Sequence, residues 1–166
     1  IRLVCWMKFT SPLTEAILLR RYKRFFADVA VSKTDRRTLY CPNKGAMRGC
    51  NILGSRLWFS KDTHKSRKYP DTWEIVEVDG GYLVAINTEI SNDLVEEGLR
   101  EGILTECLGF ESIERKVGVA NHHHRFDFKL TYDNAPDCYM EVKTVTMGDE
   151  IHRGFYPDEF NEHNSR

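Results

Sequence analysis

The chain has 166 residues, of which 41% are hydrophobic and 30% are charged, and its net charge at pH 7 is −1. This composition suits a globular protein with one large domain or two small ones. No apolar run approaches the roughly 20 residues that span a bilayer, and the first nine residues lack the pattern of a signal peptide. We therefore expect a cytoplasmic protein that does not bind a membrane.

Charge is distributed unevenly along the chain. Residues 1–70 contain 16 of the 24 Lys and Arg residues and only four acidic residues, whereas residues 71–166 contain the other 8 basic residues and 21 acidic ones. A basic first half favours a polyanionic partner. A charge match between the two halves of the same molecule would give the same asymmetry, and charge alone does not separate these explanations.

The cysteines argue against a disulfide-rich domain and against a zinc-binding domain. There are five of them, an odd number, and no two are closely spaced. A disulfide framework normally uses an even set, and a zinc site uses paired ligands. We expect reduced thiols, as in cytosolic proteins.

In chain order, the first half predicts short strands. An extended pattern covers residues 16–31, and further strands are expected at 36–41, 56–60, 73–78 and 82–87, the last two joined by the turn Asp79-Gly80-Gly81. Such strands with basic, turn-rich connections are typical of a small OB-fold-like β-barrel. Basic stretches at 20–24 and 61–68 lie among aromatic residues, which fits phosphate contacts and base stacking. A barrel with an aromatic core and a solvated basic face would have the same pattern.

The second half predicts a helix followed by strands. Apolar residues recur at helical spacing over 93–106, and Ser91 or Asn92 can cap this helix. Strands are expected at about 113–119, 125–130 and 138–146, and a domain boundary near 86–91. Three consecutive histidines, His122 to His124, precede the second of these strands. Because successive strand residues point to opposite faces, they cannot all bind one zinc ion, and a polar loop is expected.

The hairpin from Arg125 to Val145 carries the clearest chemistry. Centred on Asn134, it places Asp127 opposite Glu141, with Lys143 on the same face as Glu141. Two carboxylates about 5 Å apart repel each other unless a cation lies between them, and Mg²⁺ (or Mn²⁺ as a substitute) suits such a pair. Lys143 can then orient an attacking water or stabilise charge on a phosphoryl oxygen.

The competing acid, Asp137, lies about 13 Å from Glu141 along the strand. Taken alone, Glu-x-Lys on a strand is more often a solvated sheet face.

With these residues in view, the chain resembles the sugar fermentation stimulation protein A family. The matching segments occur in order at 20–29, 41–47, 67–74, 86–88, 125–128 and 136–146. The resemblance implies an α/β (α+β) protein with an N-terminal OB-fold-like barrel, residues 7–86. A restriction-endonuclease-like PD-(D/E)xK α/β domain follows, residues 87–158, and is expected to be incomplete.

The resemblance also implies sequence-nonspecific DNA binding, with RNA as an alternative, and a regulatory link to sugar, notably maltose, metabolism. Asp127, Glu141 and Lys143 match the nuclease-type motif, with the two carboxylates as metal ligands. Glu97 matches a helix glutamate that would complete the acidic cluster. The candidate nucleic-acid contacts are Arg20, Arg21, Lys23, Arg24, Lys44, Arg67 and Lys68.

Three features depart from the family pattern. Lys44 replaces the usual Thr in a turn, residues 1–6 precede Met7, which aligns with the usual start, and residues 159–166 no longer match. We expect both ends not to be native-like, and a truncated second domain with an exposed sheet edge and apolar face. Three hypotheses remain: a DNA-binding protein with a nuclease-type site, a magnesium-dependent DNA or RNA endonuclease, and an inactive gene fragment.

Overall fold

The computed structural model describes residues 7–9, 11–61, 68–118, 125–148 and 154–155. The chain forms two compact units, one built from Lys8–Glu89 and the segment from Thr144 onward, and the other mainly from Ile90–Lys143. The break between Glu89 and Ile90 lies within the region 86–91 where a boundary is expected. The assignment of residues 7–86 and 87–158 to two domains stays a prediction. None of the helices in the described ranges is long and apolar enough to cross a membrane.

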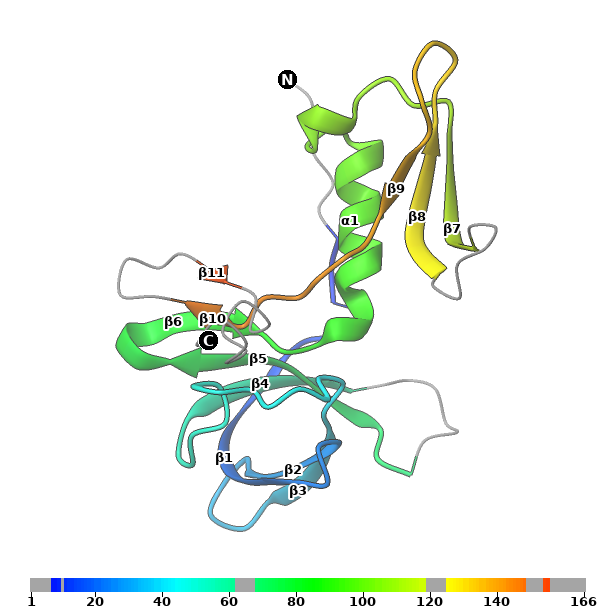
Figure 1. Ribbon diagram of the computed structural model, residues 1–166. Coiled ribbons are helices and arrows are strands. Elements are labelled where there is room, and N and C mark those ends of the chain that lie inside the picture. Colours follow the sequence, from blue (N-terminus) through cyan, green and yellow to red (C-terminus); the bar gives the residue numbers. More distant parts are fainter. Residues whose placement is uncertain (1–6, 10, 62–67, 119–124, 149–153, 156–166) are drawn as a thin grey trace, which may run out of the picture. The chain divides into compact units, whose positions relative to one another are not determined.

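Five strands of the first unit close into a barrel (Figure 1). They are β1 (Thr14–Tyr22), β2 (Phe26–Ala30), β3 (Arg36–Tyr40), β4 (Arg56–Lys61) and β5 (Asp71–Val78). Antiparallel pairing runs β3-β2-β1-β4-β5, and a parallel contact between Tyr40 and Thr72 joins β3 to β5. This closed five-stranded order confirms the predicted OB-like barrel. β6 (Tyr82–Ala85) extends β5 through the 3-10 turn Asp79–Gly81, which confirms the predicted hairpin.

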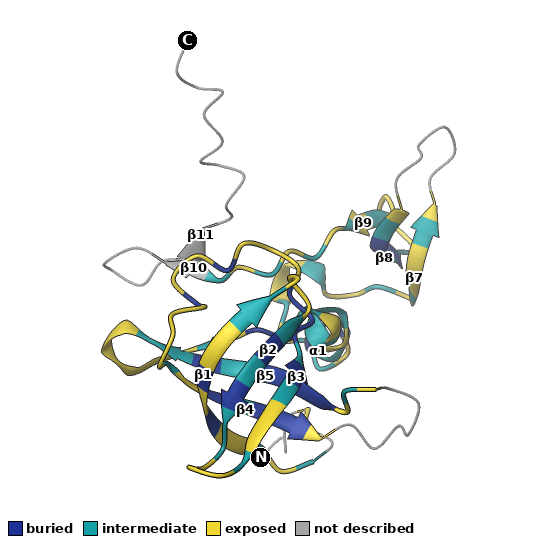
Figure 2. Cartoon of the chain, turned by 90° about the horizontal axis from the view of Figure 1, so that it is seen from below, coloured by how far each residue is buried: buried dark blue, intermediate teal, exposed yellow. Residues whose placement is uncertain are grey.

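Alternation along the strands builds the barrel core. In β1, Ala16 and Leu18 are buried, whereas Ile17 and Leu19 between and beyond them are exposed, as expected when successive side chains point to opposite faces. Figure 2 shows the buried positions (dark blue) along the barrel strands. The largest side chains that are fully buried here are Leu18, Val29, Leu39, Leu57, Phe59, Trp73 and Val76.

The extended pattern at 16–31 is divided in the structure by a turn between β1 and β2. Lys23 and Arg24 adopt left-handed φ angles of 50° and 62°. Neither residue type favours this region, so no sequence signal marks the turn. The guanidinium of Arg21 stabilises it, because Nη2 donates to the carbonyl of Arg24 at 3.1 Å and to that of Asn43 at 2.8 Å.

The second unit contains helix α1 (Ser91–Arg100), which is preceded by the 3-10 turn Thr88–Ile90 and followed by the 3-10 turn Thr105–Cys107. The predicted cap is wrong. Ile90 occupies the N-cap position with helical φ and ψ, because the 3-10 turn runs directly into the helix, and no side chain caps it. The helix also ends six residues before the predicted 106, since Gly102 takes a φ of 67° and its N–H donates to the carbonyl of Leu99.

Three antiparallel strands complete this unit: β7 (Ser112–Gly118), β8 (Arg125–Thr131) and β9 (Cys138–Met140). Phe128 pairs with Met140, Lys129 with Tyr139 and Leu130 with Cys138, so the β8–β9 hairpin is centred on Asn134 as predicted. β9 ends at Met140 rather than at 146. In the first unit, β10 (Met147–Gly148) pairs with β11 (Gly154–Phe155).

A buried carboxylate joins three segments of the barrel unit. Glu74 is only 5% exposed. It accepts a hydrogen bond from the hydroxyl of Ser60 at 2.5 Å and another from the side-chain amide of Asn87 at 2.8 Å. A buried carboxylate without donors would strongly disfavour the folded state. These two donors therefore fix the end of β6 and the strand β4 against β5.

We expect Ser60→Ala to lower the free energy of unfolding by about 1–3 kcal/mol, because it leaves one Glu74 oxygen buried without its donor. Urea denaturation followed by tryptophan fluorescence measures this change. Thr14→Ala, which removes an exposed hydroxyl from β1, is the control, with a change of about 0.5 kcal/mol or less. Equal stability of the Ser60 variant and the parent would contradict the role assigned to this network.

Candidate functional site

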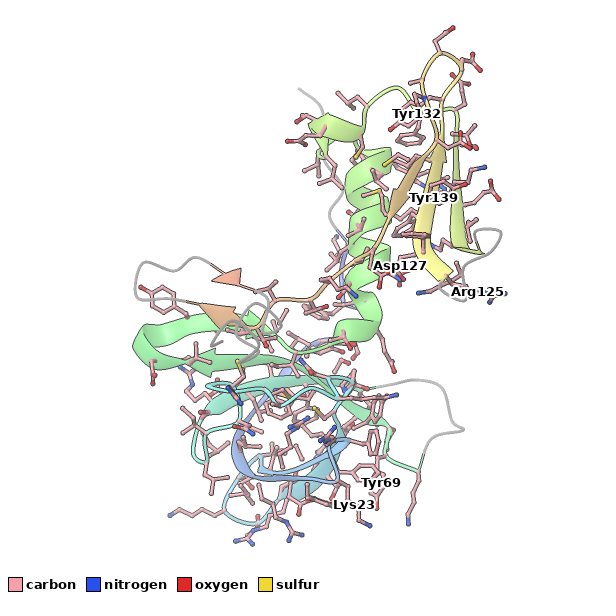
Figure 3. All side chains as sticks on the ribbon, viewed as in Figure 1. Lys23, Tyr69, Arg125, Asp127, Tyr132 and Tyr139 are labelled. Atoms are coloured by element: carbon pink, nitrogen blue, oxygen red, sulfur yellow. The ribbon has the colours of Figure 1, made fainter. Side chains whose placement is uncertain are left out.

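The carboxylate of Asp127 lies at the centre of the second unit. It is 7% exposed and accepts three hydrogen bonds. Asn92 of α1 donates through Nδ2 at 2.9 Å and the Lys116 ammonium of β7 donates to the same oxygen, Oδ1. The backbone N–H of Val142 donates to Oδ2 at 2.8 Å. Figure 3 shows Asp127 on β8 where the strand passes α1.

These contacts keep Asp127 ionised. Burial by itself would raise its pKa, but the hydrogen bonds from Lys116, Val142 and Asn92 and the charge of Lys116 outweigh burial and lower the pKa to about 2. A strongly shifted pKa caused by specific partners is typical of functional sites, although structural ion pairs produce it as well.

Glu141 and Lys143 lie just beyond the end of β9. The observed strand pairing ends at Phe128 and Met140, and one further step of the same register would put Glu141 opposite Asp127. Beyond that end, the backbone N–H of Val142 donates to Asp127 Oδ2. Lys143 Nζ lies 2.8 Å from Glu141 Oε1. Asp137, the competing acid, instead accepts Lys129 at 3.0 Å. Glu141 and Lys143 thus pair with each other and follow the strand that ends beside Asp127, and their assignment to one site with Asp127 stays a prediction.

Glu97 is half-buried on α1, one turn after Asp93. Asp93 and Glu96 both pair with Arg115 of β7, so this side of the helix faces the sheet. Within the described ranges, no three Asp, Glu, His or Cys side chains are grouped to hold an ion. Glu97 therefore does not complete an acidic cluster with Asp127 and Glu141 in this conformation.

The residues that are present nevertheless fit a hard divalent ion. Mg²⁺ needs only one or two protein carboxylates, because water and substrate phosphate fill its other positions. Asp127 and Glu141 could provide two oxygen ligands if the register continues by one step, and among the described residues Asp127 Oδ2 accepts only the Val142 N–H. Oδ1, by contrast, already accepts two donors, one of them a cation.

Sequence reasoning missed two of the residues around Asp127. Asn92 was assigned to capping, whereas its side chain reaches Asp127. Lys116 falls opposite Asp127 in the β7–β8 register, between the pairs Arg115–Phe128 and Val117–Phe126. Centring that hairpin between residues 121 and 122 would have revealed it, but no turn signature marks this centre.

On the barrel, Arg20, Arg36 and Arg37 line a groove of about 400 Å³ together with Leu19, Asp28 and Thr38, which we call the arginine groove. Two of its three arginines are held by carboxylates. Arg20 Nε lies 2.6 Å from Asp28, and Arg37 Nη2 lies 3.0 Å from Asp35. Burial alone would raise the pKa of Asp28, but hydrogen bonds from Thr38 and Arg20 lower it. The groove is thus a net positive surface, since three arginines and one aspartate line it.

Four aromatic rings lie beside one another on the same barrel: Tyr22, Phe25, Phe26 and Tyr69, here called the ring strip. Phe26 lies 5.8 Å from Tyr22, 6.4 Å from Phe25 and 5.0 Å from Tyr69, measured between ring centroids. Three of the rings carry a cation: Arg20 over Tyr22 at 4.8 Å, Lys44 over Phe25 at 5.8 Å and Lys68 over Tyr69 at 5.5 Å.

The predicted nucleic-acid contacts therefore separate into groups. Arg20, Lys44 and Lys68 accompany the ring strip, and Lys23 and Arg24 are exposed in the β1–β2 turn (Figure 3 labels Lys23 and Tyr69). Arg21 is instead structural, since its guanidinium bonds backbone carbonyls. Arg67 and His122 to His124 lie outside the described residues. Arg36 was missed, because it lies between the two basic stretches, 20–24 and 61–68, that were singled out.

Two family models match the chain. A model described as the SfsA N-terminal OB domain matches residues 19–86, and one described as the sugar fermentation stimulation protein RE domain matches residues 89–162. The second match includes Glu97, Asp127, Glu141 and Lys143.

Curated relatives carry the same description. A sugar fermentation stimulation protein homolog from Shewanella frigidimarina is 40% identical over 152 residues, which cover 92% of this chain and 64% of the relative. Homologs from Pseudomonas fluorescens and Pseudomonas putida are 45% and 43% identical and cover 86% and 92% of this chain. The chain spans only 60% and 61% of those two proteins.

A solved structure, titled as Pyrococcus furiosus SfsA in complex with Ca²⁺, has the same fold. Its TM-score is 0.73, with 22% sequence identity, and the match covers 86% of this chain and 58% of that one. At this identity the likeness establishes the arrangement of the elements alone.

The low pKa of Asp127 predicts acid sensitivity. Its folded-state pKa of about 2 lies below the ordinary value, so the charged form stabilises the fold above about pH 4, and this contribution is lost as the pH falls toward 2. We expect Asp127→Asn to lower the free energy of unfolding by about 2 kcal/mol at pH 7, with a difference from the parent that disappears between pH 4 and pH 2.

Urea denaturation across this pH range measures the difference, and carbon NMR of the Asp127 carboxyl measures the pKa itself. Asp133→Asn, in the exposed loop of the same hairpin, is the control and should leave stability within about 0.5 kcal/mol. An Asp127 titration midpoint near 4, or a stability difference that does not change with pH, would refute the assigned contacts.

Proposed function

Because this chain belongs to the sugar fermentation stimulation protein family, we propose that its barrel binds nucleic acid without sequence specificity and that its second unit carries a nuclease-type metal site. The ring strip is the observation that carries the first part. Bases of any identity could stack on its rings when the cations that now lie over them turn to the phosphates between successive bases.

The arginine groove supports the same proposal. Arg20 lines the groove and also lies over Tyr22 of the ring strip, so the proposed phosphate-binding and base-stacking surfaces adjoin each other. Phosphate and stacking contacts carry no direct sequence information. Binding of DNA, and of RNA as an alternative, would then depend on charge and on access to the bases. Such binding would also be the physical means of any regulatory role in sugar metabolism.

We expect Tyr69→Ala to weaken binding of a single-stranded oligonucleotide by about 1–3 kcal/mol, because one stacking surface is lost, while the salt dependence is kept. Arg36→Gln should instead reduce the slope of log K against log salt by about 0.7 on a single strand. Fluorescence anisotropy at several salt concentrations measures both quantities.

Arg100→Gln is the control for charge, because it makes the same change on α1 in the other unit. It should leave both affinity and salt slope unchanged. Binding that does not depend on salt, or three variants that all bind like the parent, would contradict a nucleic-acid surface on the barrel.

The second candidate function is a magnesium-dependent DNA or RNA endonuclease. It is favoured by the hairpin register, which places Glu141 opposite Asp127 when continued by one step, and by the pairing of Lys143 with Glu141. The Ca²⁺ named with the Pyrococcus structure is also a hard cation that prefers oxygen ligands. A bound divalent ion would neutralise charge on the phosphoryl oxygens. Asp127 and Glu141 would hold it, and the Lys143 ammonium would face the scissile phosphate.

For cleavage we expect Glu141→Gln to abolish nicking of a supercoiled plasmid in Mg²⁺ and in Mn²⁺, while nucleic-acid binding is largely kept. Glu141 is the better test position, because it is exposed, whereas Asp127 is buried and its replacement also affects folding. Asp137→Asn, which changes the acid paired with Lys129, should cut like the parent. Equal cleavage by the Glu141 variant would remove Glu141 from the site.

A further inference from the structure

Lys116 has an unusual backbone for a lysine in a strand. Its φ is 54°, in the left-handed region. The pairing of β7 with β8 skips Lys116, which lies between the pairs Arg115–Phe128 and Val117–Phe126. A residue without a special preference for this region adopts it only when its surroundings compensate. Here the ion pair between the Lys116 ammonium and the carboxylate of Asp127 compensates for the left-handed backbone.

The two partners of this ion pair differ in exposure. The side chain of Asp127 is 10% exposed, whereas that of Lys116 is 58% exposed. The carboxylate is fixed by Asn92 and by the N–H of Val142, neither of which is charged. Lys116 is thus the only one of the three donors that neutralises Asp127, and its long side chain can leave toward solvent. Of the three donors to Asp127, the Lys116 ammonium is therefore the one that another cation can replace.

Other lysines of the same sheet lack this combination. Lys129 pairs with Asp137 at 3.0 Å, but that carboxylate lies in an exposed loop and does not face Glu141. Such surface pairs contribute little and are easily exchanged. Lys116, by contrast, holds the one buried carboxylate of the hairpin, which is also the one that the register places opposite Glu141.

We propose that Lys116 is an internal cation that takes the place of a divalent ion at Asp127 and thereby sets the affinity of the site for that ion. The inference rests on the metal site proposed above. A divalent ion on Asp127 Oδ2 would lie close to the Lys116 ammonium on Oδ1 of the same carboxylate, and like charges repel. Ion binding is therefore weakened while Lys116 stays in place and strengthened when its side chain leaves, so Lys116 acts as a residue that determines affinity rather than as a catalytic group.

The test compares Mn²⁺ binding, by calorimetry on the full chain, in the parent, Lys116→Met, Lys116→Arg and Lys129→Met. Lys116→Met keeps the length of the side chain and removes its charge. We expect it to bind Mn²⁺ about tenfold more tightly than the parent, a change in line with the removal of one competing charge. Lys116→Arg keeps the charge and should bind like the parent. Lys129→Met makes the same change in net charge on the neighbouring strand and should also bind like the parent.

Carbon NMR of the Asp127 carboxyl, without metal, separates the contact from the metal site. In Lys116→Met the titration midpoint of Asp127 should rise, whether or not an ion binds. Equal Mn²⁺ affinity of the parent and Lys116→Met would overturn the role of Lys116 and leave the metal site standing. Tighter binding in Lys129→Met as well would overturn it too, since the gain would then be one of net charge. No Mn²⁺ binding by any folded variant would overturn the metal site itself, and the proposal with it.

Discussion

The carboxylate of Asp127 receives donors from three separate segments of its unit: Asn92 from the helix, Lys116 from β7 and the N–H of Val142 after β9. A buried charge is tolerated only when it is paired and hydrogen-bonded, so these segments must keep their positions for the unit to fold. The same requirement keeps Asp127 ionised and directs it toward the end of the hairpin where Glu141 and Lys143 lie. Structure and candidate chemistry thus depend on one group.

The barrel carries the ring strip at its surface, where Phe25 is exposed and the other three rings are half-buried. Phe26 contacts Tyr22, Phe25 and Tyr69, and cations cover three of these rings. Carboxylates fix the neighbouring arginines, Asp28 for Arg20 and Asp35 for Arg37. The proposed binding of a polyanion would use this net positive surface.

Much of this arrangement follows from local sequence rules. Alternation and turn residues predicted the barrel strands, and symmetry about Asn134 predicted the β8–β9 register, because a short loop fixes the pairing of the strands that it joins. Contacts between distant segments could not be predicted. The bond from Asn92 to Asp127, the pairing of Lys116 and the binding of carbonyls by Arg21 all depend on how elements pack. The turn at Lys23 and Arg24 was missed because neither residue normally signals one.

We propose above that the carboxylates of Asp127 and Glu141, at the end of the β8–β9 hairpin, form a divalent-ion site. Paramagnetic broadening of amide NMR signals by Mn²⁺ tests it most directly, since the effect falls steeply with distance from the ion and needs no assumption about activity. The account predicts that the signals of Asp127, Glu141 and Val142 broaden first, at the lowest Mn²⁺ concentrations. Broadening that begins elsewhere on the folded protein, or none in this hairpin, would contradict it.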